Sequence, residues 1–132
     1  MRHSFFATAW FWFAMLLAGP AFAQHCLVCA GGNAKAGEAV FQRCAMCHTH
    51  AKGEGNAVGP NLFGVVGRKA GSIPGFFYSV AMKNAGFTWT NARLDAYIAA
   101  PQKVVSGNRM PFAGLPSARQ RADLIAYLDT LK

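Results

Sequence analysis

Short stretches with apolar residues at helical spacing alternate along this chain with long stretches rich in glycine, proline and polar residues. The clearest helical stretch closes the chain. Ser117 and Gln120 form a capping-box pair at its start, and apolar residues follow at intervals of three and four. The apolar stripe of this helix consists of Leu124, Tyr127, Leu128 and Leu131.

Three more helices are predicted upstream. One runs from Ala34 to Arg43, with Gly37 and Phe41 on one face, and a short one covers Tyr78 to Ala85. A third runs from Asn91 to Ala100 after Thr90 as its cap, and Pro101 ends it. Its apolar face consists of Leu94, Tyr97 and Ile98. Residues 49–77 and 102–115 are expected to be loops, so the pattern indicates a small all-α domain of three to five helices, wrapped around a prosthetic group that replaces part of the core.

The first residues have the features of a secretory signal. Arg2 and His3 precede an apolar run from Phe5 to Leu17, and an A-x-A site ends at Ala23. Residues 1–23 are therefore the predicted signal peptide, and cleavage after Ala30 is the alternative; residues 31–132 form the predicted domain. An exported, periplasmic protein is predicted, and an uncleaved membrane anchor is the alternative.

The chain is basic, with 13 lysines and arginines against 5 acidic residues. The positive charges form no dense run, and the signal directs the protein out of the cytoplasm. Docking to acidic protein surfaces is therefore a better explanation of the charge than binding of nucleic acid.

Cys44, Cys47 and His48 form the motif C-x-x-C-H, the spacing for covalent attachment of a c-type haem. The two thiols can add to the haem vinyl groups, and the imidazole can bind the iron. A zinc half-site or a redox C-x-x-C is the alternative, but further zinc ligands and a βαβ context are not evident. A second C-x-x-C pair, Cys26 and Cys29, has no following histidine, and no function is assigned to it.

The other axial ligand must come from a different part of the chain. The candidates are His25, His50, Met46, Met82 and Met110. Met110 is favoured because it lies in a loop that can reach across the haem, whereas Met82 lies on a predicted helix and is better explained as core. A thioether ligand would close the iron to oxygen and favour one-electron transfer over catalysis. The Pro60 carbonyl is a candidate acceptor for the Nδ1–H of His48.

Five motifs follow one another in order: CAMCH, GPNLFGVVGRKAG, FFYSVAMKNAGFTW, GNRMPFAGL and RADLIAYL. With them the chain, from Lys35 to Lys132, resembles the class I cytochrome c family, both the mitochondrial proteins and the short bacterial periplasmic ones. The resemblance implies the cytochrome c fold around one covalently attached haem c. It also implies that Gly37 and Phe41 meet Leu124 and Tyr127 where the terminal helices cross.

The resemblance also assigns roles to single residues. Cys44 and Cys47 would carry the thioethers, and His48 and Met110 would bind the iron. Tyr78 and Trp89 would donate to a buried propionate whose charge Arg68 offsets. Tyr97 would lie beside the Met110 sulfur, and Phe112 would cover the exposed haem edge. In contrast to the mitochondrial proteins, Met82 replaces an asparagine of a polar network, and Gln102 and Ser117 stand where lysines are usual.

The predicted function is that of a monomeric one-electron carrier, not an enzyme. It would connect a quinol-oxidising complex with a terminal oxidase, reductase or photosynthetic reaction centre through transient contacts with acidic partners. Two alternatives remain: a dedicated electron acceptor of one periplasmic dehydrogenase, and a protein with an open iron such as a peroxidase or gas sensor. The thinned basic edge, which keeps Arg43, Lys103 and Arg109, suggests partners that differ from the mitochondrial ones.

Overall fold

The computed structural model describes residues 31–132. The predicted signal segment, both proposed cleavage sites and the Cys26–Cys29 pair fall outside or at the border of this range. None of the helices between residues 31 and 132 has the length and apolar character needed to span a bilayer.

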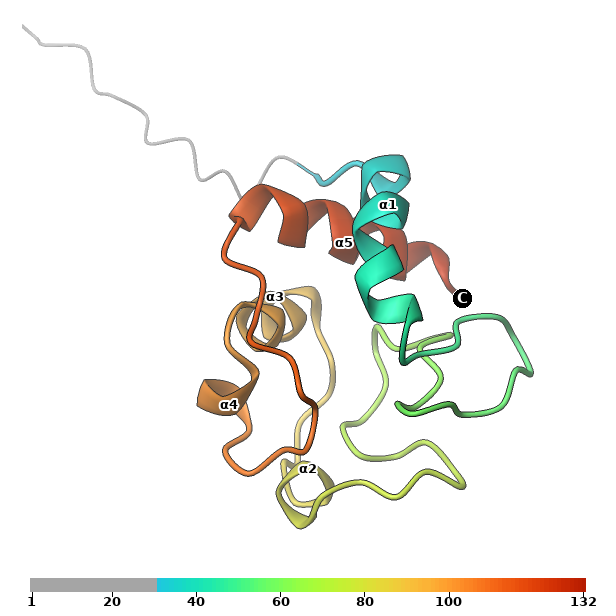
Figure 1. Ribbon diagram of the computed structural model, residues 1–132, viewed down its shortest axis with the longest axis vertical. Coiled ribbons are helices and arrows are strands. Elements are labelled where there is room, and N and C mark those ends of the chain that lie inside the picture. The colour runs from blue at the N-terminus through green and yellow to red at the C-terminus, as the bar shows by residue number, and fades with distance from the viewer. Residues whose placement is uncertain (1–30) are drawn as a thin grey trace, which may run out of the picture.

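The described part of the chain is helical and contains no β-strand, only an isolated bridge between Lys69 and Thr88. The helices are α1 (Ala34–Ala45), α2 (Val80–Lys83), α3 (Asn91–Ala99), α4 (Pro101–Val104) and α5 (Ala118–Thr130). Figure 1 shows α1 crossing α5 at one end of the molecule, while the connection between α1 and α2 forms one side of it. The predicted all-α class is confirmed.

The helix ends follow local capping. The Ser117 side chain accepts from the backbone N–H of Gln120 at 3.3 Å, as the capping-box pattern predicts. Thr90 accepts in the same way from the N–H of Arg93 at 3.2 Å. Ser79 caps α2, so this helix starts two residues later than the predicted Tyr78. These side chains satisfy backbone donors that have no partner inside the helix.

The prediction that residues 102–115 form only a loop was wrong. Pro101 ends α3 but also begins α4, because proline lacks an N–H and its fixed φ suits the first position of a helix. The Pro101 side chain is fully buried. The first residue of the short helix is therefore packed in the core, and this packing fixes the position of α4, from which the following loop begins.

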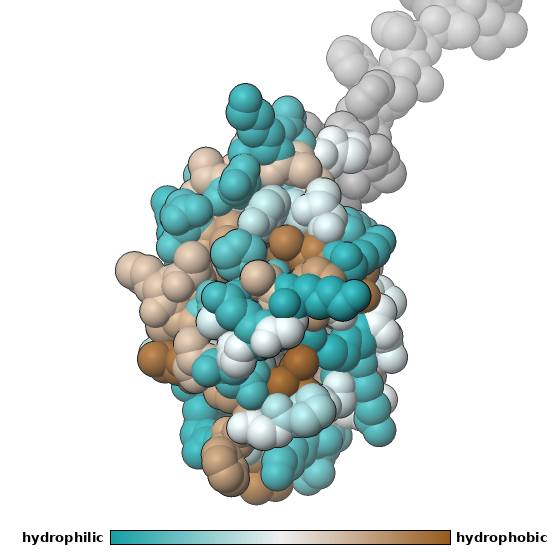
Figure 2. All heavy atoms as spheres, turned by 90° about the vertical axis from the view of Figure 1, so that its right-hand side faces the viewer, coloured by the Kyte–Doolittle hydropathy of each residue, from teal (hydrophilic) through white to brown (hydrophobic). Residues whose placement is uncertain are grey.

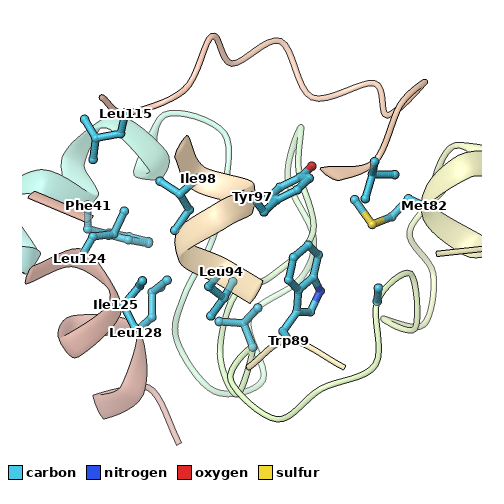
Figure 3. Close-up of a cluster of buried hydrophobic side chains, with 13 residues drawn as sticks. Phe41, Met82, Trp89, Leu94, Tyr97, Ile98, Leu115, Leu124, Ile125 and Leu128 are labelled. Carbon is cyan, nitrogen blue, oxygen red and sulfur yellow. The ribbon is translucent and has the colours of Figure 1, made fainter. Parts of the chain in front are cut away.

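Helices α1 and α5 approach closely because Gly37 has no side chain. A Cβ atom there would overlap the backbone carbonyl of Asp123 and lie 2.9 Å from Cβ of Tyr127. One turn further, the rings of Phe41 and Tyr127 are 5.1 Å apart. Figure 3 shows Phe41 beside Leu124 in the same cluster, so the expected crossing of the terminal helices is present.

The buried side chains extend from this crossing to the other end of the molecule. Trp89 and Tyr97 lie between the α1–α5 crossing and Met82 in Figure 3, and their rings pack edge to face at 4.8 Å. Met82 is 8% exposed and belongs to the core, as predicted. The core is therefore elongated, and the candidate site lies along it.

Candidate haem site

The C-x-x-C-H motif forms a tight turn at the end of α1. The backbone N–H groups of Cys47 and His48 both donate to the Cys44 carbonyl, each at 2.9 Å. Cys44 and Cys47 are not joined to each other by a disulfide, and burial raises the pKa of the Cys44 thiol. Between residues 31 and 132, no three histidine, cysteine or acidic side chains gather as a metal site, so the zinc alternative finds no further ligands there.

The His48 ring has a defined orientation and proton position. Its Nδ1 lies 2.7 Å from the Pro60 carbonyl oxygen, the contact that the sequence suggested. A carbonyl can only accept, so Nδ1 carries the hydrogen and Nε2 keeps a free lone pair. Burial lowers the pKa of His48, which keeps the imidazole neutral and able to bind a metal.

The backbone at Gly59 packs directly against the His48 ring, and the sequence analysis did not predict a role for this glycine. A Cβ atom at this position would overlap the imidazole, and the Gly59 N–H donates to the Cys47 carbonyl at 2.7 Å. The chain therefore passes directly against the ring. The only available signal was that this glycine directly precedes the proline that accepts from His48.

A cavity of about 730 Å³ opens beside this turn. Its volume lies within the range of about 300–1,000 Å³ that is usual for sites of small ligands and cofactors. Its lining includes all ten residues that the sequence analysis assigned to the site: Cys44, Cys47, His48, Pro60, Arg68, Tyr78, Trp89, Tyr97, Met110 and Phe112. Its apolar walls include Leu62, Val65, Leu94, Ile98, Leu124 and Leu128.

Several hydrogen-bond donors line this cavity. Its charged lining residues, within the range the structure describes, are Arg43, Arg68 and Arg109, and none is acidic. The Arg68 guanidinium donates to the carbonyls of Phe63 at 2.8 Å and Asn61 at 3.0 Å. The hydroxyl of a tyrosine and the indole N–H of a tryptophan add further donors, from Tyr78 and Trp89. An apolar cavity with only basic charges fits a flat apolar group that carries carboxylates, as haem does.

Met110 enters the lining from the segment between α4 and α5. Its backbone N–H donates to Oδ1 of Asn108 at 3.0 Å, and its carbonyl accepts from the Phe112 N–H at 2.9 Å. Tyr97, also part of the lining, is buried, and burial raises its pKa to about 12. The loop placement predicted for Met110 is thus present.

The other ligand candidates within residues 31–132 are less well placed. His50 is not part of the cavity lining, and its ring packs 4.8 Å from Phe41 at the α1–α5 crossing. Met46 is 80% exposed at the rim. Met82 lines the cavity from α2 but is also part of the core. His25 falls outside the described range.

Two buried asparagines were also missed. The Asn61 amide nitrogen donates to the carbonyls of Ala51 and Glu54, both at 3.0 Å, and ties together the connection that carries Pro60. Asn108 holds the backbone of Met110, as described above. Both lie within two residues of a predicted site residue, and that proximity was the only sequence signal.

These features define a class: a small helical protein built around one covalently attached haem. The family model for cytochrome c matches residues 34–132, and this chain belongs to the cytochrome c family. Its cofactor is one covalently bound haem c with its iron, for which Cys44 and Cys47 provide the attachment motif.

Individual relatives agree with this assignment. Cytochrome c2 of Rhodoblastus acidophilus is 50% identical over 101 residues, which cover 76% of this chain and 94% of the relative. Cytochrome c of Sesamum indicum is 47% identical over 98 residues, covering 74% and 88%. The solved structure of cytochrome cH from Methylobacterium extorquens superposes with a TM-score of 0.71 at 45% identity, covering 75% of this chain and 99% of that one.

Proposed function

We propose that this protein is a periplasmic monohaem electron carrier whose iron is bound by His48 and Met110. The observation that carries the proposal is that both side chains line one cavity together with Cys44 and Cys47. The haem supplies a one-electron redox couple when it is bound. The cytochrome c2 and cytochrome cy relatives, the latter matched over only half of its length, are consistent with this role.

The chain's own residues attach, orient and enclose the cofactor. His48 offers a neutral imidazole that the Pro60 carbonyl holds in one tautomer. Met110 offers a soft, neutral thioether, which raises the reduction potential relative to a second histidine. If His48 and Met110 both bound the iron, the protein would leave it no open position for a substrate, so the proposed role is electron transfer and not catalysis.

The remaining predicted residues share the task of holding the propionates and excluding water. Tyr78 and Trp89 would donate hydrogen bonds to a propionate, and the Arg68 guanidinium would offset its negative charge. Tyr97 would lie beside the Met110 sulfur, and Phe112 would cover the exposed edge. Support for this arrangement is that all five side chains line the same cavity and that no acidic residue of the described range does.

The rim of the cavity is proposed as the docking surface for acidic redox partners. It combines the basic Arg43 and Arg109 with the exposed apolar side chains of Met46 and Phe77. Figure 2 views the side that carries the α1–α2 connection, where hydrophobic residues are exposed among hydrophilic ones. Complementary charge accelerates encounter more than it strengthens the complex, which suits a shuttle between a quinol-oxidising complex and an oxidase, reductase or reaction centre.

The ligand assignment is tested with the ferric holoprotein. A weak absorption band at the red end of the visible spectrum reports a bond between methionine sulfur and ferric iron. We expect the band in the wild type and in Met82→Leu, and its loss in Met110→Leu. Loss of the band in Met82→Leu together with its retention in Met110→Leu would transfer the role to Met82.

The docking proposal is tested by the rate of electron transfer to a terminal oxidase with an acidic docking face. The second-order rate constant should fall as ionic strength rises, and Arg43→Glu should lower it several-fold at low salt. Lys35→Glu is the matched control, because it makes the same change in charge on an exposed residue outside the cavity lining. Equal rates for the two variants, or rates indifferent to salt, would refute docking at this rim.

A further inference from the structure

Two amide side chains tie the segment that carries Met110 to the rest of the protein. We infer that Asn108 and Gln102 are positioning residues that keep Met110 at the cavity and so set how readily Met110 detaches from the iron. The inference rests on the proposed ligation by Met110. It concerns the two side chains that hold this ligand in place, for which the sequence analysis had predicted no role.

Asn108 is the inner tie. It is 7% exposed, and its amide nitrogen donates to the Val105 carbonyl at 2.8 Å. Its Oδ1 accepts from the backbone N–H of Met110 at 3.0 Å. Both ends of the side chain are thus engaged, one by the end of α4 and one by the ligand residue itself. A buried amide that lost either partner would carry a desolvation cost, so the two bonds support each other.

Gln102 is the outer tie, one residue after the buried Pro101 that starts α4. Its Nε2 donates to the Asn108 carbonyl at 2.9 Å, and its Oε1 accepts from the Gly107 N–H at 3.2 Å. One side chain therefore holds two consecutive residues of the loop. The chain of contacts runs from the core through α4 to Gln102, then to Asn108 and Met110.

The amide group is what makes this tie possible. A lysine, which is usual here in the mitochondrial proteins, could donate to the Asn108 carbonyl but could not accept from the Gly107 N–H. Ser106, Gly107 and Arg109 are exposed, and Arg109 makes a separate contact, with the Phe77 carbonyl. Without the two amides, the loop would still have the backbone bond from Asn108 to the Val105 carbonyl and the packing of Met110 and Phe112 against the core, but it would lose its side-chain hydrogen bonds to α4 and to the Met110 backbone.

The expected consequence is a change in the fraction of molecules with Met110 detached. An external ligand such as imidazole binds ferric iron only in that fraction, so its apparent Kd falls in proportion as the fraction grows. Loss of one neutral hydrogen bond corresponds to about a five-fold change in such an equilibrium. The Asn108 variant should show the larger effect, because its bonds are buried.

The test is an imidazole titration of the ferric holoprotein, followed by loss of the red band. Gln102→Ala removes both outer bonds, and Gln102→Glu removes only the donor. We therefore expect the apparent Kd for imidazole to be highest in the wild type, lower in Gln102→Glu and lowest of the three in Gln102→Ala, where it should be about five-fold or more below the wild-type value. The apparent Kd of Asn108→Ala should be lower still. Lys103→Ala is the matched control, since Lys103 is the exposed neighbour on α4.

Guanidinium unfolding of the same variants separates positioning from general destabilisation. A fall in Kd for Gln102→Ala that Lys103→Ala does not share supports the inference, and so does partial recovery in Gln102→Glu. Unchanged Kd values in both Gln102 variants would overturn it and leave the proposed function intact. Absence of the red band in the wild type would overturn both, because Met110 would then not be a ligand. The Gln102 variants decide the question even where Asn108→Ala fails to fold.

Discussion

Gly37→Ala should destabilise the protein although alanine is the better helix former. The substitution removes the entropic disadvantage of glycine, which alone would stabilise α1 by about 1 kcal/mol. The new Cβ, however, would overlap the Asp123 backbone carbonyl and lie only 2.9 Å from Cβ of Tyr127. Favourable contact between carbon atoms requires about 3.5–4.0 Å, so the helices must separate by about 1 Å.

That separation loosens the contact of Phe41, the largest fully buried side chain, with α5. Overpacking of this kind costs typically about 1–3 kcal/mol, and an immobile backbone carbonyl as the obstacle favours the upper part of that range. After subtraction of the helix-propensity gain, the net loss should be about 1–2 kcal/mol. For a domain of this size, the loss corresponds to a fall in Tm of about 4–16 °C.

The assay is guanidinium unfolding of the holoprotein, followed by circular dichroism at 222 nm. Ala39→Gly is the matched control: it is exposed on the same helix, and it should report the propensity difference alone, as a loss of about 1 kcal/mol. If propensity governed position 37, the alanine variant would be more stable than the wild type. A midpoint for Gly37→Ala equal to or above that of the wild type would refute the packing argument.

Three further predictions concern the site and the pH dependence. Gly59→Ala should displace the His48 ring and weaken its hydrogen bond to the Pro60 carbonyl, which raises the basicity of the imidazole, so the midpoint potential of the holoprotein should rise. Gly55→Ala is the control, because a Cβ atom there would meet open space, and equal potentials for the two variants would contradict the prediction. The pKa of the Asp123 carboxyl is lowered by a backbone N–H and then by a neighbouring arginine. The contribution of Asp123 to stability is therefore present above its unfolded pKa of about 3.9 and is lost as the pH falls through the folded value. In denaturant titrations, the stability advantage of the wild type over Asp123→Asn should shrink from about pH 6 to about pH 3. Burial raises the pKa of Tyr97 to about 12, so the stability that the neutral phenol contributes persists to about pH 10 and is lost as the pH rises through the folded value. The phenolate absorbance that Tyr97→Phe removes should titrate near 12, and a midpoint near about 10 would contradict the burial of Tyr97.

Much of the fold was predictable because it depends on local patterns. Apolar spacing and caps identified α1, α3 and α5, and their boundaries agree with the structure within about two residues. The α4 helix was missed because Pro101 was interpreted only as the end of a helix. A four-residue helix has too few positions for a periodic pattern, so only the burial of Pro101 in the folded protein distinguishes it from a loop.

The site was predictable where chemistry and spacing coincide, and not where it depends on close packing. The C-x-x-C-H motif identified Cys44, Cys47 and His48 directly, whereas most of the other cavity residues followed from family resemblance. Gly59 and Asn108 were missed for a physical reason. Gly59 acts because it places no side chain next to the His48 ring, and Asn108 acts through hydrogen bonds to two backbone groups. Neither role produces a pattern in one sequence.

The two proposed iron ligands are supported in different ways, and the difference bears on how the site would open. On the His48 side, the supports are a turn continuous with α1, the Pro60 carbonyl and the buried backbone at Gly59. On the Met110 side, they are the amide contacts of Asn108 and of Gln102, and the Gln102 bond to the Gly107 N–H is exposed at the surface. Surface hydrogen bonds exchange readily with water and contribute less to stability than buried ones. Detachment should therefore begin at Met110, while the covalent attachment and His48 keep the cofactor in its cavity, so the carrier can regain its closed state without loss of haem.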